Sequence, residues 1–345
     1  MSVDIVIGVD AGGTSTRCAA VTLDGRVAGR GRAGGANQNS STDPGGAFRA
    51  ALREALGAAG DVTVVRAVFG VAGAGESGHA RALATVRGVW AELGLPGDPE
   101  VNDDVAVAFA AGSAAPVGLV LIAGTGAVAA RVRDGRVLCR CDGYGWLLGD
   151  EGSAVWIGLA GLRAVLAAID GRGRPTVLRG RLADALGVPP GDPQAIIRAV
   201  HDRPPAELGR LAPEVMGAAG DGDPVASGIA EDAARRLLTN LAAVAPVPET
   251  AAGSAAAQGA EPDREPVVLA GAVLAAGPVA EAVRAGVRRR FGVAPILAID
   301  GALGAAGLAL RQTGAPPAAH AALLAQAAPQ SADPRADGTT GLVAS

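Results

Sequence analysis

The sequence predicts an α/β protein made of two similar domains with a cleft between them. Its 345 residues suggest two domains, at about 150 residues each. A strand, a glycine turn, a second strand, an Asp-Gly turn and a third strand follow one another twice, and helical and strand patterns alternate after each set. The four residues Asp-Gly-Arg-Val occur in this order at 24–27 and again at 134–137. We therefore expect a duplicated unit.

The first unit begins with a β-branched run that is typical of a buried strand. The expected strands are at 3–9, 17–22, 26–28 and 62–71, and the expected helices are at 45–60 and 79–93. A short acidic stretch, Asn102 to Asp104, then follows a strand end and precedes a helical stretch at 105–111. We place the N-terminal domain at residues 1–115.

The second unit repeats this order and adds a long, mostly helical region at 176–244. Its expected strands are at 118–123, 127–132, 138–141, 267–270 and 295–299, and its further helices are at 153–169, 278–291 and 302–313. We place the C-terminal domain at 116–314, with a mobile low-complexity loop at 246–266 and a last helix that can pack on the N-terminal domain. The tail at 315–345 lacks a stable period, so we expect it to be disordered.

Composition excludes several classes of function. A formal charge of −4 offers no footprint for nucleic acid. The sequence contains no lysine, which excludes a Walker A loop, a lysine Schiff base and the protein-kinase lysine. Three cysteines and three histidines are too few and too scattered to predict a His/Cys metal site or a disulfide framework. We find neither a signal peptide nor a membrane span, and we expect a cytoplasmic protein.

Two glycine turns at equivalent places predict a phosphate-binding cleft. In the first turn, Gly12, Gly13, Thr14, Ser15 and Thr16 offer backbone amides and hydroxyl groups to an anion. The second turn is formed by residues 124–126, which are Gly124, Thr125 and Gly126. Either turn alone could be an ordinary β-turn. Their pairing across one cleft favours a polyphosphate held from both sides.

Carboxylates at strand ends supply the candidate catalytic chemistry. Asp10 ends the first strand and could hold hydrated Mg²⁺, which prefers carboxylates and water. Asp103 and Asp104 lie where a carboxylate can point into the cleft as a general base, although the local sequence favours helix N-capping as the role of one of them.

A glycine-rich, aromatic segment precedes the helix expected at 153–169. Residues 143–153 carry Gly143, Tyr144, Gly145 and Trp146, followed by two adjacent acids, of which the first is Asp150. An aromatic ring and a carboxylate together suit the apolar face and the hydroxyl groups of a sugar. The alternative is a capped helix start, with Ser153 or Asp150 as the cap and the aromatic rings in the core.

Together these motifs resemble the BadF/BadG-type ATPase and N-acetylglucosamine kinase family, within the sugar-kinase, actin and heat-shock ATPase superfamily. The most specific segment is Gly-Asp-Glu-Gly-Ser-Ala-Val-Trp-Ile at 149–157, and the similarity spans about residues 3–312 apart from the loop at 246–266. The first and second glycine turns and Asp300-Gly-Ala also match. The resemblance implies two ribonuclease-H-like, actin-like ATPase domains with an interdomain cleft.

The resemblance also implies a function and roles for single residues. The activity would be transfer of the γ-phosphate of ATP, with Mg²⁺, to the 6-hydroxyl of an amino sugar such as N-acetylglucosamine. Asn37 and Asp150 would bind the sugar, Gly271 would border the adenosine, and Asp10 would orient Mg²⁺ through water. Both glycine turns would hold phosphate. Spacing to the large apolar Phe109 favours Asp104 over Asp103 as the base.

Alternative functions remain open at this point. A glucosamine or other hexosamine kinase, an ATPase activator of a reductase and a non-catalytic sugar sensor share parts of this pattern. The expected partners are therefore ATP and a small amino sugar, without nucleic acid or membrane, and the family resemblance allows a homodimer.

Overall fold

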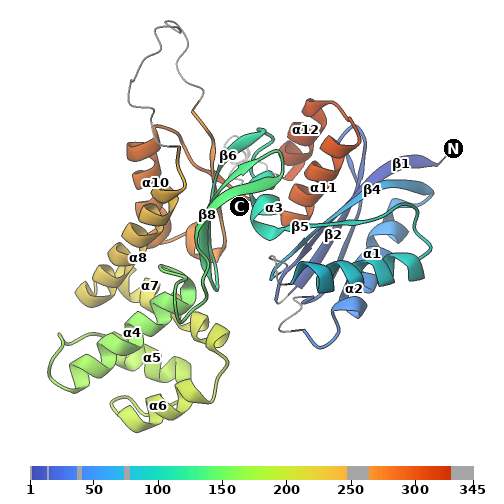
Figure 1. Ribbon diagram of the computed structural model, residues 1–345. Helices are drawn as coiled ribbons and strands as arrows, with labels where there is room; N and C mark the ends of the chain where they lie inside the picture. Colours follow the sequence, from blue (N-terminus) through green and yellow to red (C-terminus); the bar gives the residue numbers. More distant parts are fainter. Residues whose placement is uncertain (1, 14, 37–40, 74–77, 247–263, 328–345) are drawn as a thin grey trace, which may run out of the picture.

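A computed structural model describes residues 2–13, 15–36, 41–73, 78–246 and 264–327 of the chain. It contains two five-stranded sheets of the same topology (Figure 1). Their strand orders are β3-β2-β1-β4-β5 and β8-β7-β6-β9-β10. In each sheet the first three strands form an antiparallel meander and the last two pair in parallel. The expected α/β fold with a duplicated unit is confirmed.

The first sheet and its helices come from the first 110 residues. In chain order the elements are β1 (Val3–Ala11), β2 (Ser15–Thr22), β3 (Val27–Gly34), α1 (Pro44–Ala59), β4 (Val62–Val71), α2 (His79–Glu92), β5 (Glu100–Asp103) and α3 (Asp104–Ala110). Buried residues of α1 and α2, among them Phe48 and Trp90, form one core with the inner face of this sheet. The expected elements of this unit are all present, but the strand expected at 26–28 extends to Gly34.

The second sheet carries a larger set of helices. The elements are β6 (Val117–Ala123), β7 (Ala127–Arg133), β8 (Arg136–Asp142), α4 (Ala154–Ile169), α5 (Leu178–Leu186), α6 (Pro193–His201), the 3₁₀ helix η1 (Pro205–Leu211), α7 (Ala212–Gly220), α8 (Pro224–Ala243), β9 (Val267–Ala270), α9 (Ala272–Ala275), α10 (Pro278–Phe291) and β10 (Ile296–Leu297). The strand expected at 295–299 is reduced to Ile296 and Leu297, which pair with Val268 and Leu269 of β9.

Two helices connect the sheets and thereby position the site. Helix α3 lies between them: Val107 packs toward the first sheet, whereas Val105 and Phe109 pack against the second. Helix α11 (Gly301–Gln312) returns from the second sheet and packs on β1 and β4. The N-terminal ends of both helices lie at the same junction, since Asp104 of α3 and Gly301 of α11 line one pocket.

The chain end corrects one expectation. Residues 315–345 were expected to be disordered from composition, but Pro317–Ala327 form helix α12, which packs on α11. The prediction is wrong for this segment because Leu323 is fully buried and His320 is 1% exposed. The His320 Nε2 lies 2.9 Å from the carbonyl oxygen of Ala110, so a buried polar contact also ties α12 to α3. Residues 328–345 lie outside the described residues.

The low-complexity loop expected at 246–266 is described only at its edges. At its end, Glu265 forms an ion pair with Arg131 on β7, and the carbonyl of Pro266 accepts a hydrogen bond from Leu119 at 2.9 Å. These contacts begin the parallel strand β9. Among the described helices, none combines the length and the apolar character that a membrane crossing requires.

Candidate active site

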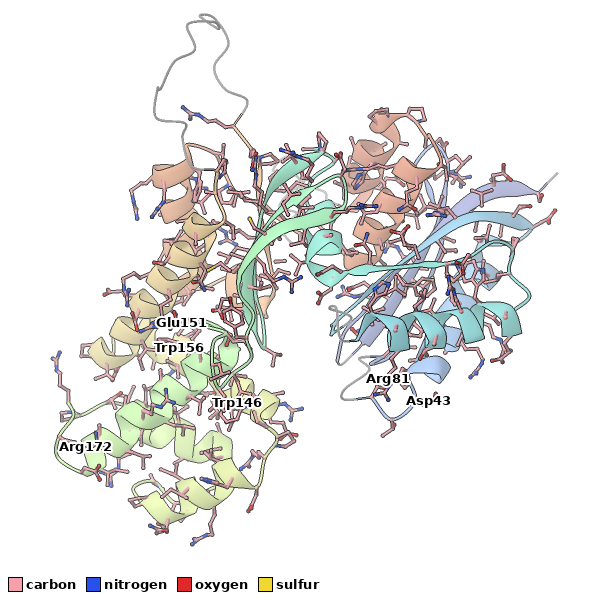
Figure 2. All side chains as sticks on the ribbon, viewed as in Figure 1. Asp43, Arg81, Trp146, Glu151, Trp156 and Arg172 are labelled. Atoms are coloured by element: carbon pink, nitrogen blue, oxygen red, sulfur yellow. The ribbon has the colours of Figure 1, made fainter. Side chains whose placement is uncertain are left out.

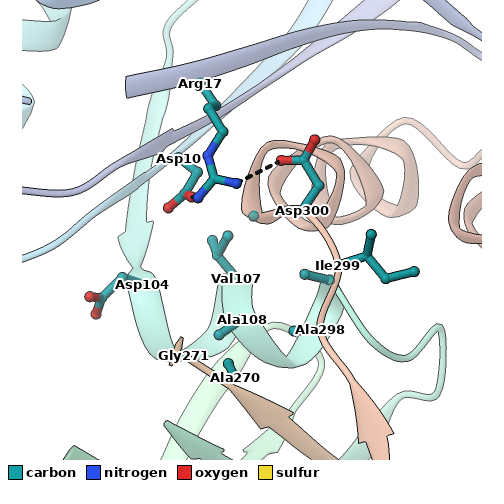
Figure 3. A pocket seen from close by; sticks show the side chains of 12 residues that line it. Asp10, Arg17, Asp104, Val107, Ala108, Ala270, Gly271, Ala298, Ile299 and Asp300 are labelled. Carbon is teal, nitrogen blue, oxygen red and sulfur yellow. Dashed lines mark ion pairs between the residues drawn. The ribbon is translucent and has the colours of Figure 1, made fainter. Parts of the chain in front are cut away.

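A pocket of about 240 Å³ lies where the two sheets meet (Figure 3). The first sheet and α3 contribute Asp10 and Asp104, and the second contributes Gly271. Arg17 and Asp300 complete its polar lining. The structure therefore brings together three residues that the sequence predicted for the site and adds two that were not assigned a role.

Asp10 and Arg17 face each other across the turn between β1 and β2. They are paired in register on the two strands, and Arg17 Nη2 lies 3.3 Å from Asp10 Oδ2. Arg17 also lies 3.9 Å from Asp300, which caps α11 and pairs with Arg30 at 2.7 Å. Burial raises the pKa of Asp10, and Arg17 opposes this shift. The pocket thus holds carboxylates whose charge is only partly compensated by arginine.

Asp103 and Asp104 have different surroundings although they are adjacent. Asp103 caps α3 by accepting a hydrogen bond from the amide of Val105 at 3.0 Å, and it forms an ion pair with Arg140 on β8. Asp104 lines the pocket instead. Burial, together with the negative charges of Asp103 and Asp10, raises the pKa of Asp104 to about 7. Its neighbour thus serves as the helix cap, while Asp104 can accept a proton near neutral pH.

The first glycine turn is a short connection between two paired strands. Strand β1 runs to Ala11 and β2 begins at Ser15, and the amide of Gly12 donates to the carbonyl of Ser15 at 3.0 Å. Thr16 is fully buried, and its hydroxyl donates to the carbonyl of Gly34 at 2.8 Å. The prediction that Thr16 holds phosphate is therefore wrong, because its hydroxyl is used inside the sheet.

Three further predicted residues lie away from the central pocket or outside the described residues. Gly13 lines a second cavity of about 490 Å³ beside the start of α1 (residues 41–50). Thr14 and Asn37 fall outside the described residues, so their predicted roles stay predictions.

The second glycine turn lies against Gly271, the residue expected to border the adenosine. The β6–β7 turn at residues 124–126 leaves Thr125 exposed. Gly271 has a φ of +95°, and a Cβ there would lie 2.3 Å from the carbonyl oxygen of Ala123. Only glycine fits where the β9–α9 turn crosses this turn so closely. The backbone of Gly271 therefore lies directly against the backbone of the second turn.

Asp150 lies directly against the second turn. Its Oδ1 accepts a hydrogen bond from the amide of Ala127 at 3.2 Å, and a Cβ on Gly126 would come within 2.9 Å of its Oδ2. Burial raises the pKa of Asp150. Ser153, and not Asp150, caps α4 by accepting from the amide of Trp156. The Asp150 side chain is thus free of a capping role.

The loop at 143–149 presents its aromatic side chains to solvent. Tyr144 is 69% exposed and Trp146 is 46% exposed, so neither belongs to the core. Trp146 lies on the loop that precedes α4, on the side of the second sheet (Figure 2). The alternative that these rings are core residues is excluded. Sequence reasoning missed Asp142, a buried carboxylate at the end of β8 that contacts this loop; its only sequence signal is an Asp-Gly pair, which is typical of any turn.

Comparison with known proteins places the chain in a family. The model of the BadF/BadG/BcrA/BcrD ATPase family matches residues 7–309. The chain belongs to this family. Its fold, with two sheets of equal topology and a polar pocket at their junction, is the arrangement expected for such an ATPase, and the recognised resemblance is confirmed.

Relatives and solved structures of this ATPase family member include sugar kinases. A protein of Clostridium acetobutylicum named N-acetylmuramic acid/N-acetylglucosamine kinase is 30% identical over 247 residues, 70% of this chain and 79% of the relative. The N-acetyl-D-glucosamine kinase of Dictyostelium discoideum is 30% identical over 200 residues, 54% of this chain and 61% of the relative. A structure from Chromobacterium violaceum, described as a candidate N-acetylglucosamine kinase, has a TM-score of 0.66 at 25% identity and covers 89% of this chain and 99% of its own.

Proposed function

We propose that this chain is an ATP-dependent kinase that transfers the γ-phosphate of ATP to the 6-hydroxyl of N-acetylglucosamine. Family membership and the two kinases that are 30% identical support the coarser statement, an ATP-dependent carbohydrate kinase. The acceptor and the position of transfer are proposals that rest on the candidate site.

One observation carries the proposal: Asp104 lines the pocket between the sheets with a pKa near 7. A carboxylate with this pKa is partly ionised near neutral pH, and it is basic enough to accept the proton of a hydroxyl group during the reaction. In the proposed reaction Asp104 takes the proton of the sugar hydroxyl while the hydroxyl oxygen bonds to the γ-phosphorus. The bond between that phosphorus and the bridging oxygen breaks, and ADP leaves with the bond's electron pair.

The phosphates of ATP would lie between the two glycine turns. The backbone amides of Gly13, Thr125 and Gly126 would face the phosphates, whereas those of Gly12 and Gly124 close the turns by donating to the carbonyls of Ser15 and Gly126. Gly271 would border the nucleotide. The carboxylate of Asp10 is the kind of oxygen ligand that Mg²⁺ prefers, and a bound Mg²⁺ would neutralise phosphate charge. Phosphoryl transfer depends chiefly on such positioning and charge neutralisation. Arg17 lies 3.3 Å from Asp10 and adds a positive charge to the same end of the pocket.

The acceptor would bind against the second sheet and close the cleft. Asp150 would accept hydrogen bonds from the sugar hydroxyls, with Gly143, Tyr144 and Gly145 forming the adjoining wall. Asn37 would contact the sugar from the first domain. The exposed ring of Tyr144 suits the apolar face of a hexose. We expect the two sheets to approach on sugar binding, which would exclude water and limit ATP hydrolysis.

The experiment is ADP release from ATP and Mg²⁺ across a panel of acceptors. The panel contains N-acetylglucosamine, N-acetylmuramic acid, glucosamine, N-acetylmannosamine, glucose and a control without sugar. Strong stimulation by N-acetylglucosamine, with ³¹P–¹H coupling at carbon 6 of the product, is the expected result. Stimulation by another hexosamine would reassign the acceptor, and hydrolysis that ignores every sugar would contradict a kinase.

An activator that holds an iron–sulfur cluster is the second class of function to test. Cys18 is buried in β2, whereas Cys139 and Cys141 lie on β8 of the other sheet. The described residues assemble no group of three or more His, Cys, Asp or Glu side chains that could hold a metal ion. Protein purified without oxygen is expected to be colourless and free of iron, and a stoichiometric iron content would favour the activator.

A further inference from the structure

We propose that Asp142 is a positioning residue for the sugar acceptor. Its carboxylate holds both ends of the loop at 143–149 and thereby sets the place of Asp150. The inference rests on the proposed role of Asp150 as a sugar ligand. It assigns a function to a buried carboxylate that is 6% exposed and takes no part in the phosphoryl transfer described above.

The hydrogen bonds of Asp142 connect the end of β8 with the start of α4. Oδ1 accepts from the amides of Gly143 at 2.8 Å and Asp150 at 2.7 Å. Oδ2 accepts from the amide of Glu151 at 2.8 Å and from the side chain of Asn240 at 3.0 Å. Four donors therefore converge on one carboxylate, and three of them are backbone amides of the loop and its edges. Hydrogen bonds to a charged acceptor are stronger than neutral ones.

The backbone at both ends of the loop shows why such an anchor is needed. Asp142 has a φ of +67° and Asp150 a φ of +54°, and the only other described non-glycine residue with positive φ is Asp134 in the β7–β8 hairpin. A left-handed conformation costs free energy for any residue with a Cβ, although Asp and Asn tolerate it best. The bonds from Asp142 to the amides of Gly143 and Asp150 offset this cost.

Asp150 in turn contacts the second glycine turn. Its carboxylate accepts from Ala127 at 3.2 Å, and the amide of Ala154 donates to the carbonyl of Gly124 at 2.8 Å. The same short segment therefore places the proposed sugar ligand and braces the proposed phosphate turn. A displacement of the Asp150 backbone would first affect acceptor binding, because Asp150 is the proposed sugar ligand.

Asn240 fixes the orientation of the Asp142 carboxylate from helix α8. It is 7% exposed, its amide group donates to Asp142, and its Oδ1 lies 3.7 Å from the thiol of Cys141, which can donate to it. An Asn at position 142 would keep one acceptor oxygen but turn an NH₂ group toward two donors. The Asp142→Asn variant therefore loses half of the anchor while it keeps the size and the φ preference of the residue.

Asp223 offers a matched control elsewhere in the same domain. Its carboxylate, 8% exposed, also accepts from three backbone amides and one side chain: Val177, Val225, Ala226 and the hydroxyl of Thr176, at 2.9 to 3.1 Å. Asp223→Asn thus removes a comparable buried acceptor at the start of α8. Within the described part of the chain, no hydrogen bond or ion pair of Asp223 reaches the loop at 143–149.

The test compares wild type, Asp142→Asn and Asp223→Asn as full-length proteins. Steady-state kinetics give KM for the sugar and for ATP, and thermal unfolding gives Tm. Hydrogen–deuterium exchange reports the protection of the amides of Asp150 and Glu151. We expect Asp142→Asn to raise the sugar KM about tenfold, the effect of losing one hydrogen bond to a charge. The ATP KM should change less than about threefold, and protection at 150–151 should fall.

Asp223→Asn is expected to lower Tm to a similar degree while it leaves the sugar KM and the protection at 150–151 at wild-type values. Equal sugar KM values in the two variants, or unchanged protection at 150–151 in Asp142→Asn, would overturn the inference while the wild type still phosphorylates its sugar. Absence of sugar phosphorylation by wild type would instead overturn the proposed function. A loss of protection in Asp142→Asn would then still support the anchor of the loop, but not its role in acceptor binding.

Discussion

The two glycine turns occupy the same place in sheets of the same topology, yet their surroundings differ. The β1–β2 turn is flanked by charged side chains of its own strands, Asp10 and Arg17, which lie 3.3 Å apart. The β6–β7 turn has no such pair on its own strands; the carboxylate that contacts it, Asp150, comes from the loop before α4. The duplicated scaffold thus provides two backbone turns, while the chemistry added to each half is different.

The difference also appears in the chain that follows each meander. One helix, α1, connects β3 to β4 in the first sheet, whereas α4 to α8 connect β8 to β9 in the second. This larger insertion carries the loop at 143–149, Asp150 and Asn240. The first half therefore supplies the proposed base, Asp104, and the proposed magnesium ligand, Asp10. The second half supplies Asp150, the proposed ligand of the sugar hydroxyls.

The largest expected effect separates the adjacent carboxylates of the first half. Asp104→Asn is expected to lower kcat by about 10²- to 10⁴-fold, because it removes the proposed base. Asp103→Asn should lower kcat less than about tenfold, since Asn also caps helices well. Steady-state turnover of both variants checks this. Nearly full turnover in Asp104→Asn, with loss in Asp103→Asn, would reverse the assignment.

The next prediction uses a matched pair of glycines in the second turn. A Cβ on Gly126 would lie 2.9 Å from the Asp150 carboxylate, whereas a Cβ on Gly124 meets no described atom within 4 Å. Gly126→Ala is therefore expected to raise the sugar KM about tenfold by displacing Asp150. Gly124→Ala should act on the ATP KM and leave the sugar KM within about twofold. A raised ATP KM in Gly126→Ala together with a raised sugar KM in Gly124→Ala would contradict these assignments.

The pH dependence of kcat/KM tests the assignment of Asp104, in the first half, as the base. The pKa of Asp104 is raised to about 7, so the base is increasingly protonated below that pH. We expect kcat/KM of the wild type to fall about tenfold per pH unit below 7 and to level off above it. Direct detection of sugar phosphate avoids coupling enzymes. A profile that stays flat from pH 7 to pH 5 would contradict a base with this pKa.

The smallest expected effect is on stability. Because folding raises the pKa of Asp104 from 3.8 to about 7, ionised Asp104 destabilises the folded state, and stability is lost as pH rises through this interval. Asp104→Asn should therefore have a Tm about 3 °C above wild type at pH 8. The difference should shrink toward pH 4.5. A variant less stable than wild type at pH 8 would show that Asp104 is compensated in the folded protein.

The repeated meander, the strand ends and the long helices were predictable because each depends on local periodicity and turn residues. Helix α12 was not, because its Ala-rich stretch becomes ordered only by burying Leu323 and His320 against neighbouring elements. The family spacing favoured Asp104 over Asp103, but the different surroundings of the two carboxylates could not be predicted, because only the fold places Arg140 beside Asp103.

Parts of the site depended on contacts between distant residues and could not be read locally. Thr16 belongs to a glycine turn motif, but the β2–β3 pairing buries its hydroxyl against Gly34. Asp142 has the appearance of a turn residue, whereas its partner Asn240 lies almost a hundred positions away. Motifs thus pointed to residues that the fold brings to one pocket, whereas the contacts of each side chain depend on tertiary structure.

The most direct test of the account is sugar-dependent ADP release by wild type beside Asp104→Asn, each with and without N-acetylglucosamine. The account predicts that the sugar stimulates wild type strongly and that Asp104→Asn shows no more than a small residual stimulation. ADP release that is independent of sugar and equal in the two proteins would contradict both the kinase and the role of Asp104.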